Sequence, residues 1–546
     1  MKLYFYTVIT IIILAIASCT GNGKGKDLTV ASTTQGKVKG YMKDSVLIFK
    51  GIPYAEAERF MPAVPHAPWD TLLDCTRYGN ISPQGEQRRY TAYNPLDTVM
   101  TMGEDCLNLN IWTSARTDDD FAERPVMVWL HGGGFDYGYS HVNLASDGSK
   151  LAKNENVVVV SLNHRLNALG HLDLSAYGEE YEGSGNLALT DIVQALKWIK
   201  ENIKSFGGNP DNVTIFGHGA GGVKVLALMG MPMAKGYFHK AIVQSGTLAG
   251  LTQTQEVSRR VAQLTMEEAG VTTVDDLKAL PYDSLLNAST RAVWRARSEF
   301  DSHLDDLVKL GPVVDHKILP GTLFSDTCIQ ISKNVPVILG STFAEDKTQQ
   351  YVHDLENNAR NYAHKLTGEE LDKAIRERFG ENTEAVKKAF TEAYPDKQLQ
   401  ELLTMDTHVR AIVLYMAHKL ARRGNAPVYV YLFNWVSPLD NGLAKSFRSS
   451  EVPFIFNNHE LAEFSRAGGD EARRLARIMS RCWTTFARTG NPNNSITPFW
   501  RRIAPGEGRT MLFGRDLQLV GYPDLPLIQI TEPEYTSDIV LYDSKS

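Results

Sequence analysis

The segment with the clearest chemical pattern is FGHGAGG, residues 216–222, which follows an apolar run. Gly217 and Gly221 flank a central position with the spacing G-x-X-x-G. This spacing is typical of a sharp strand-to-helix turn that presents its central side chain, usually a serine nucleophile, to a substrate. The central residue here is Gly219, which has no side chain. The segment therefore predicts a turn built for a nucleophile that is absent.

Elements that would position this turn are visible as an alternation of strands and helices. Apolar residues from Leu189 to Ile203 recur at helical spacing, and charged helical patterns cover residues 252–305 and 354–423. Short apolar runs rich in β-branched residues, typical of strands buried on both faces, lie at 126–131, 157–162, 213–216, 241–244, 335–340 and 428–433. The alternation predicts an α/β fold with a large, mostly parallel sheet, helices on both faces and inserted helical segments.

Several long blocks occur in a characteristic order along the chain. They are ERF at 58–60, GEDCLNLNIW at 103–112, WLHGGGF at 129–135, the segment 185–222, FHKAIVQSG at 238–246 and FARTGNPN at 486–493. With these blocks the chain resembles the type B carboxylesterase family, the cholinesterase-like branch of the α/β-hydrolase fold, over nearly all of residues 28–542. The resemblance implies one α/β-hydrolase domain over residues 28–546. We expect no cofactor and no bound metal.

Members of that family hydrolyse esters with a Ser-Glu-His triad in that chain order. The imidazole takes the serine proton, and the carboxylate orients and stabilises the imidazole. The resemblance maps the acid to Glu345 in GSTFAEDK, although Ala344 and Asp346 depart from the family's loop. It maps the nucleophile to Gly219, where the family's serine is lost.

The base is expected three residues before a glutamate, within a segment that ends in phenylalanine. In FRSSEVPFIF, residues 447–456, Glu451 holds the glutamate place and Arg448 stands where histidine should be. Arginine cannot serve as a base because its guanidinium stays protonated in proteins. His218 lies beside Gly219, but neighbouring residues cannot share the nucleophile position, so we interpret it as an ordinary satisfied or partly exposed imidazole. Two of the three triad members are thus replaced.

Other parts of the site are predicted to persist. The resemblance places an oxyanion hole at the backbone N–H groups of Gly132, Gly133 and Ala220. A buried carboxylate without its histidine needs a partner, so we expect Arg448 to form an ion pair with Glu345. An arginine beside preorganised N–H groups would favour an anionic ligand such as a carboxylate, and the ion pair would weaken that attraction.

The N-terminal residues predict export and membrane attachment. Residues 1–18 have a lysine followed by an apolar stretch too short to span a membrane, the layout of a signal peptide. The ending ahead of Cys19 resembles a bacterial lipobox, so Cys19 is the expected lipid-modified residue, with ordinary secretion as the alternative. Residues 19–27 are polar and glycine-rich, typical of a flexible tether. We therefore expect an exported bacterial lipoprotein on the periplasmic face or the cell surface.

The charge of the chain argues against nucleic-acid binding, and its cysteines raise the question of a disulfide. The net charge of −6 provides no basic surface for nucleic acid. Of the four cysteines after Cys19, Cys75 and Cys106 form the favoured disulfide because they share the N-terminal region, and four isolated thiols are an equal alternative.

Three functional interpretations follow from the replaced triad. The first is a lipid-anchored, non-hydrolytic protein that binds a small ligand or a protein partner; neuroligins, which resemble it in having glycine at the elbow, offer a family precedent. The second is a carboxylic ester hydrolase that uses a non-standard site. The third is a structural surface protein with a vestigial cleft. Fold alone does not choose among them, because function depends on the site.

Overall fold

The structure of the protein is a computed structural model. The structure describes residues 27–85, 100–115, 123–142, 144–246, 252–300, 308–345, 366–423, 425–442, 444–504, 506–537 and 539. The predicted signal peptide, Cys19 and nearly all of the predicted tether lie outside these residues, as does the start of the helical segment predicted from residue 354.

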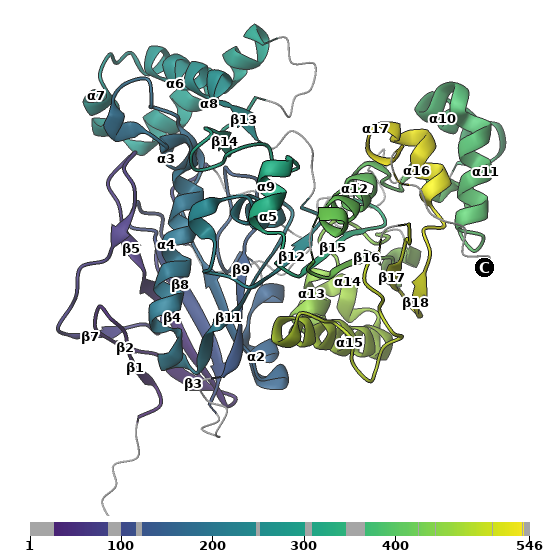
Figure 1. The fold of residues 1–546 in the computed structure, drawn as a ribbon, viewed down its shortest axis with the longest axis horizontal. Helices are drawn as coiled ribbons and strands as arrows, with labels where there is room; N and C mark the ends of the chain where they lie inside the picture. The colour runs from purple at the N-terminus through teal and green to yellow at the C-terminus, as the bar shows by residue number, and fades with distance from the viewer. Residues whose placement is uncertain are drawn as a thin grey trace, which may run out of the picture.

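A large mixed sheet of 11 strands forms the centre of the described chain (Figure 1). In spatial order its strands are β18 (Leu517–Val520), β17 (Thr510–Phe513), β16 (Val428–Phe433), β15 (Val337–Thr342), β12 (Lys240–Gln244), β11 (Gly208–His218), β9 (Arg124–Leu130), β10 (Val158–Leu162), β8 (Asn108–Ser114), β4 (Val46–Pro53) and β3 (Tyr41–Lys43). Strands from β17 to β10 pair in parallel, and the strands at both edges pair antiparallel.

All six strand runs expected from the sequence lie in the parallel part of this sheet, which confirms the predicted fold class. The described residues also form three smaller sheets. One contains β1 (Val30–Ser32), β2 (Lys37–Lys39) and β7 (Leu72–Asp74), the second pairs β13 (Gln253–Thr254) with β14 (Val313–Val314), and the third pairs β5 (Ala55–Glu56) with β6 (Val64–Pro65). Because the central strands are parallel, their carboxyl ends meet along one edge, where ligands usually bind in such sheets.

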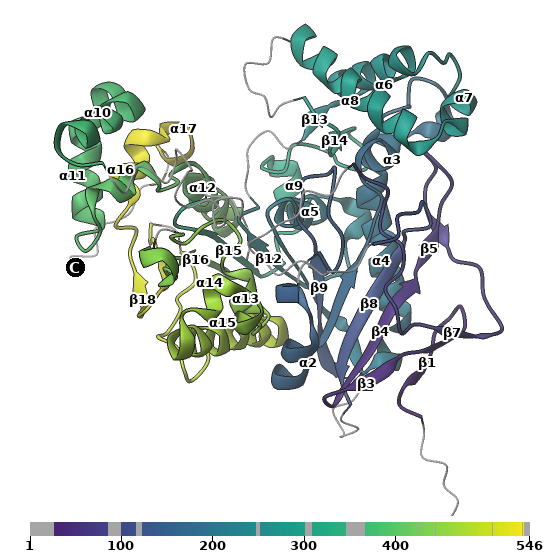
Figure 2. The same ribbon diagram turned by 180° about the vertical axis from the view of Figure 1, so that it is seen from behind.

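The two faces of the sheet pack against different helices, because successive side chains along a strand point to opposite faces. In β9, Val126 and Val128 face the cluster that includes α4 (Leu187–Asn202), α5 (Ala220–Met229) and α12 (His408–Arg423). Met127 and Trp129 face the cluster that includes α2 (Ser149–Glu155), α13 (Val452–Ile455) and α15 (Gly469–Thr489). Figure 2 shows α2 and α15 near the lower end of the molecule, away from α6 and α8.

The remaining helices are α3 (Asn167–His171), α6 (Gln255–Ala269), α7 (Val274–Ala279), α8 (Tyr282–Glu299), α9 (Asp326–Ile331), α10 (Gly368–Phe379), α11 (Thr383–Ala393), α14 (Glu463–Arg466), α16 (Leu525–Thr531) and α17 (Pro533–Thr536). Helices α6 to α8 surround a separate apolar cluster, and α10 and α11 contribute to another. Both groups fall within the segments that the sequence predicted as inserted helices. Among the helices of the described residues, none has the length and apolarity to cross a membrane.

The favoured disulfide is wrong, because Cys75 and Cys106 are separate buried thiols. Backbone hydrogen bonds hold Cys75 between Lys39 and Lys50, whereas Cys106 precedes β8. Burial raises the pKa of each thiol to about 12, so both are protonated and unreactive. Cys328 and Cys482 are free and buried as well, which is the alternative of isolated thiols.

Candidate active site

The turn at Gly219 is preserved as a nucleophile elbow. It joins β11 to α5, and the Gly219 N–H donates to the Gln244 carbonyl at 2.8 Å. Gly219 has φ 59° and ψ −124°, a region that other residues adopt only under strain. A Cβ at Gly221 would lie 2.0 Å from the Leu130 carbonyl oxygen, so the tight crossing requires glycine there too. The backbone still has the shape that would present a serine.

The glycine-rich loop lies directly beside this elbow. A Cβ on Gly132 would meet the His218 carbonyl oxygen at 3.1 Å, and Gly133 has a positive φ of 99°. Within the described part of the chain, the N–H groups of Gly132, Gly133 and Ala220 have no protein hydrogen-bond acceptor. Unpaired N–H groups from adjoining segments can bind a ligand oxygen. The arrangement is compatible with the oxyanion hole expected from the sequence.

The predicted ion pair between the acid and base positions is confirmed. Arg448 Nη1 donates to Glu345 Oε2 at 2.9 Å. The Glu345 side chain is only 1% exposed and that of Arg448 is 20% exposed, so the ion pair is largely removed from water. The Thr342 N–H also donates to Glu345 Oε1, at 2.6 Å. The carboxylate that would orient a histidine is therefore occupied by an arginine and local donors.

Sequence reasoning missed Ser245, which completes the surroundings of Glu345. Its hydroxyl donates to Glu345 Oε1, and its carbonyl accepts from Arg448 Nη2 at 3.1 Å. Ser245 is fully buried and has a positive φ of 49°, which is strained for a non-glycine residue. The available signal was its position directly after β12, because the carboxyl ends of neighbouring parallel strands meet.

Arg448 also covers the empty nucleophile position. A Cβ built on Gly219 would lie 3.1 Å from Arg448 Nη2, and among the described residues, its two chain neighbours aside, no other supplies an atom as near. A guanidinium therefore occupies the region where an imidazole would contact the serine. Since a guanidinium only donates hydrogen bonds, it cannot remove a proton from a nucleophile.

A second pair, His218 and the buried Glu451, lies beside the elbow. His218 Nε2 is 3.9 Å from Glu451 Oε1, too far for a hydrogen bond. Burial and, second, the charge of Arg448 hold the pKa of His218 well below its usual value. Burial and then the neighbouring Glu345 raise the pKa of Glu451 to about 8. At neutral pH both groups are thus uncharged. The His218 side chain is 11% exposed, in keeping with the partly exposed imidazole expected from the sequence, but its Nε2 has no hydrogen-bond partner among the described residues.

Glu451→Gln tests this protonation state through stability. The folded pKa of about 8 exceeds the ordinary value of 4.5, so wild-type stability falls as pH rises between these values and levels off above them. Glutamine mimics the neutral acid and removes this loss. The gain of the variant over wild type should grow across the window to at most about 5 kcal/mol. Urea unfolding of both proteins at a series of pH values measures it; a pH-independent difference would contradict a buried, protonated Glu451.

A possible metal-binding group lies elsewhere. His408, Glu532 and Glu534 hold candidate ligand atoms within 4.8 Å of one another, and they come from α12 and the α16–α17 region. His408 Nδ1 already lies 2.9 Å from Glu532 Oε2, which explains their proximity as an ion pair. None of these residues occupies a triad position.

The sheet, the elbow and the adjoining glycine loop are those of an α/β-hydrolase. The carboxylesterase family matches residues 27–522, and the chain belongs to this family. It is 34% identical to the para-nitrobenzyl esterase of Bacillus subtilis, over 91% of this chain and 96% of that protein. It is 28% identical to the phenmedipham hydrolase of Pseudarthrobacter oxydans, over 89% and 95% of the two chains.

Solved structures agree with these sequence relatives. An esterase from Clostridium hathewayi that can hydrolyse aliphatic aromatic polyesters matches with a TM-score of 0.81 and 33% identity, covering 93% of this chain and 98% of that one. A Geobacillus stearothermophilus carboxylesterase matches with a TM-score of 0.72 and 30% identity, covering 92% and 99%. By name, these relatives are esterases and a hydrolase.

Proposed function

We propose that this carboxylesterase-family protein binds a ligand or a protein partner without hydrolysing it. The observation that carries the proposal is the Arg448–Glu345 ion pair, at 2.9 Å, over an elbow whose central residue is Gly219. Nucleophile and base are both missing, and the remaining acid is bound to the residue that replaced the base. Loss of these groups removes the proton transfer that makes a serine hydroxyl reactive.

The same geometry bears on what would be bound. The N–H groups of Gly132, Gly133 and Ala220 would donate hydrogen bonds to a carbonyl or carboxylate oxygen of a small ligand. Because Glu345 neutralises Arg448, a net negative charge adds little attraction, and a neutral carbonyl compound or a partner that covers the elbow fits equally. We further propose that Cys19 carries the lipid that holds this exported protein at the membrane.

The deciding experiment is an assay of the purified protein with short-chain nitrophenyl esters, with and without a serine-reactive organophosphate. We expect no turnover above the rate without protein and no covalent labelling by the reagent in intact-protein mass spectrometry. The Bacillus subtilis para-nitrobenzyl esterase is the matched positive control. Turnover that the organophosphate abolishes would show that a serine nucleophile exists and would overturn the proposal.

A second candidate function is ester hydrolysis by water, with His218 as the base. The observation favouring it is that His218 is neutral and that its Nε2 has no hydrogen-bond partner among the described residues. Such a neutral imidazole next to the elbow can accept a proton from water. In the same assay this route would appear as turnover that resists the organophosphate and disappears in His218→Ala. A vestigial scaffold would show neither turnover nor ligand binding.

A further inference from the structure

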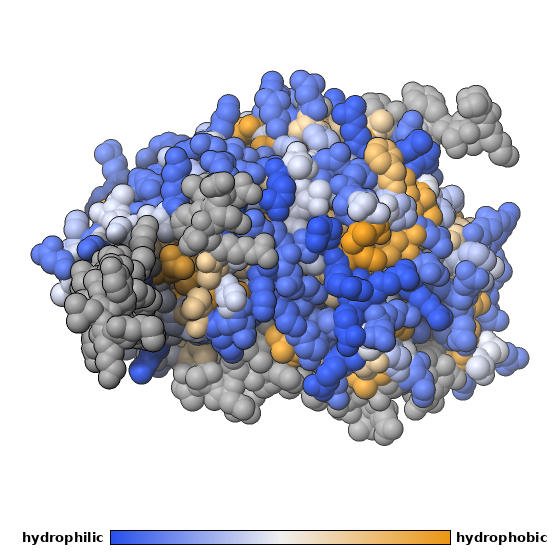
Figure 3. Space-filling model, turned by 90° about the horizontal axis from the view of Figure 1, so that it is seen from below, coloured by the Kyte–Doolittle hydropathy of each residue, from blue (hydrophilic) through white to orange (hydrophobic). Residues whose placement is uncertain are grey.

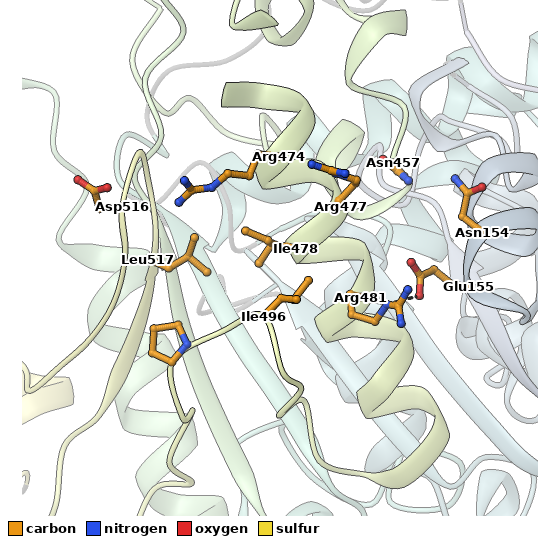
Figure 4. Close-up of a pocket in the computed structure, with 11 residues that line it drawn as sticks. Asn154, Glu155, Asn457, Arg474, Arg477, Ile478, Arg481, Ile496, Asp516 and Leu517 are labelled. Carbon is orange, nitrogen blue, oxygen red and sulfur yellow. Dashed lines mark ion pairs between the residues drawn. The ribbon is translucent and has the colours of Figure 1, made fainter. Parts of the chain in front are cut away.

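An arginine-lined groove lies along α15, outside the candidate active site. Arg474, Arg477 and Arg481 project from one side of the helix at helical spacing, as Figure 4 shows. The groove has a volume of about 890 Å³, and its other walls are the end of α2, the loop at 496–498 and the start of β18. No residue of the elbow, the glycine loop or the Arg448–Glu345 pair lines it. We call it the arginine groove.

The positive charges in this groove are only partly balanced. Arg481 Nε lies 2.7 Å from Glu155 Oε2, an ion pair drawn as a dashed line in Figure 4. Among the described residues, no side chain forms an ion pair or hydrogen bond with the guanidinium of Arg474 or Arg477. Asp516 stands on the opposite wall without contacting either of them. Two guanidinium groups therefore face the groove with free donors.

Their spacing adds a physical reason for a bound anion. Arg474 and Arg477 are three residues apart, and Arg477 and Arg481 are four apart, so they are neighbours on the helix surface. Like charges at these spacings repel and weaken a helix. An anion between Arg474 and Arg477 would replace this repulsion with attraction. Arg473, which does not line the groove, has its own partner in Asp470 at 2.6 Å.

The groove also offers apolar surface. Ile478 lies between the arginines on the helix, and Ile496, Pro498 and Leu517 face it from the other walls. Ile496 is 52% exposed, and Phe499 on the same loop is 70% exposed, both high for large apolar residues. Figure 3 shows apolar surface beside strongly hydrophilic surface on the face viewed from below, the side on which α15 lies in Figure 1.

From these features we infer that the arginine groove binds a phosphate group carrying an alkyl or acyl chain. The planar guanidinium forks of Arg474 and Arg477 donate pairs of hydrogen bonds to the phosphate oxygens. The chain of the ligand lies against Ile496, Pro498 and Leu517, which removes apolar surface from water. A lipid headgroup and a soluble phosphate ester share this chemistry.

Isothermal titration calorimetry of the full-length protein with hexyl phosphate tests the site. We expect wild type to bind hexyl phosphate, and inorganic phosphate about tenfold or more weakly because it lacks the chain. The double variant Arg474→Ala/Arg477→Ala should weaken binding of hexyl phosphate at least about tenfold. Asp516→Asn should tighten binding about twofold, because it removes the opposing charge. Since all three residues are exposed, urea unfolding should show that the variants fold like wild type.

Arg473→Ala is the control for charge on the helix, because it removes one guanidinium from α15 at a residue that does not line the groove. It should leave binding unchanged. Absence of hexyl phosphate binding by wild type, or an equal loss in Arg473→Ala and the double variant, would overturn the inference.

A second arm separates the two sources of the phosphate. All proteins in this arm also carry Cys19→Ser, so that no attached lipid binds them to membranes, and they are sedimented with phosphatidylcholine vesicles that contain or lack phosphatidylglycerol. Vesicle binding that needs phosphatidylglycerol and is lost in the double variant would support the groove and identify a lipid source. Vesicle binding insensitive to the variant, with hexyl phosphate binding lost, would support the groove and identify a soluble ester.

Discussion

The double variant Gly219→Ser/Arg448→His is expected to hydrolyse nitrophenyl esters at a rate about 10²-fold or more above wild type. The elbow already holds residue 219 where a nucleophile belongs, and the adjoining N–H groups have no acceptor among the described residues. Histidine at position 448 would lie between the new serine and Glu345, which can accept from its ring. An organophosphate should abolish the new activity.

The matched control differs from this double variant only in lacking the hydroxyl at position 219. Gly219→Ala/Arg448→His carries the same backbone strain, about 1–3 kcal/mol at such a φ, but cannot attack an ester. Neither it nor Gly219→Ser alone should show turnover, since the single variant retains a guanidinium at the base position. Equal rates for Gly219→Ser and the double variant would mean that the base is some other residue and that the assignment of Arg448 is wrong.

Arg448→Ala is expected to lower the free energy of unfolding by about 3 kcal/mol, near the lower end of the range for breaking a buried ion pair. It leaves the Glu345 carboxylate, 1% exposed, without its counter-charge. The Thr342 N–H and the Ser245 hydroxyl still donate to Glu345, which limits the loss. Urea unfolding at neutral pH measures the change.

A double-mutant cycle separates the charge effect from lost packing. Glu345→Gln/Arg448→Ala should recover much of the stability, because glutamine accepts the same two hydrogen bonds without a buried charge. Arg473→Ala breaks an exposed ion pair, with side chains 61% and 93% exposed, and should change stability by less than about 0.5 kcal/mol. Additive losses at positions 345 and 448 would contradict an energetic coupling between them.

Much of the fold was predictable because parallel strands that are buried on both faces appear in the sequence as continuous apolar runs. Val158 to Leu162, for example, must be apolar or small on both faces, so β10 appears as an uninterrupted run. The elbow was predictable for a similar reason, since the close approach of Gly221 to Leu130 leaves no space for a side chain. Such steric demands act on individual positions and can be read one residue at a time.

The unpredicted features all depend on which distant residues become neighbours. The protonation of Glu451 follows from burial next to Glu345, which is far away in sequence. The contact of Ser245 with Glu345 depends on the pairing of β12 with β15. The predicted disulfide between Cys75 and Cys106 is wrong for the same reason, because lying in the same region of the sequence does not bring two thiols within bonding distance.

A Cβ built on Gly219 would lie 3.1 Å from Arg448 Nη2. Because of this contact, the effect of a substitution at position 219 should depend on which residue stands at position 448. We expect serine at position 219 to give no ester hydrolysis while arginine stands at 448, and histidine at 448 to give none while glycine stands at 219. Neither substitution alone would then restore hydrolysis, although the backbone at position 219 already has the conformation that a serine nucleophile would need. For the proposed non-hydrolytic function, this contact means that hydrolysis would return only through two substitutions made together, with no change in fold.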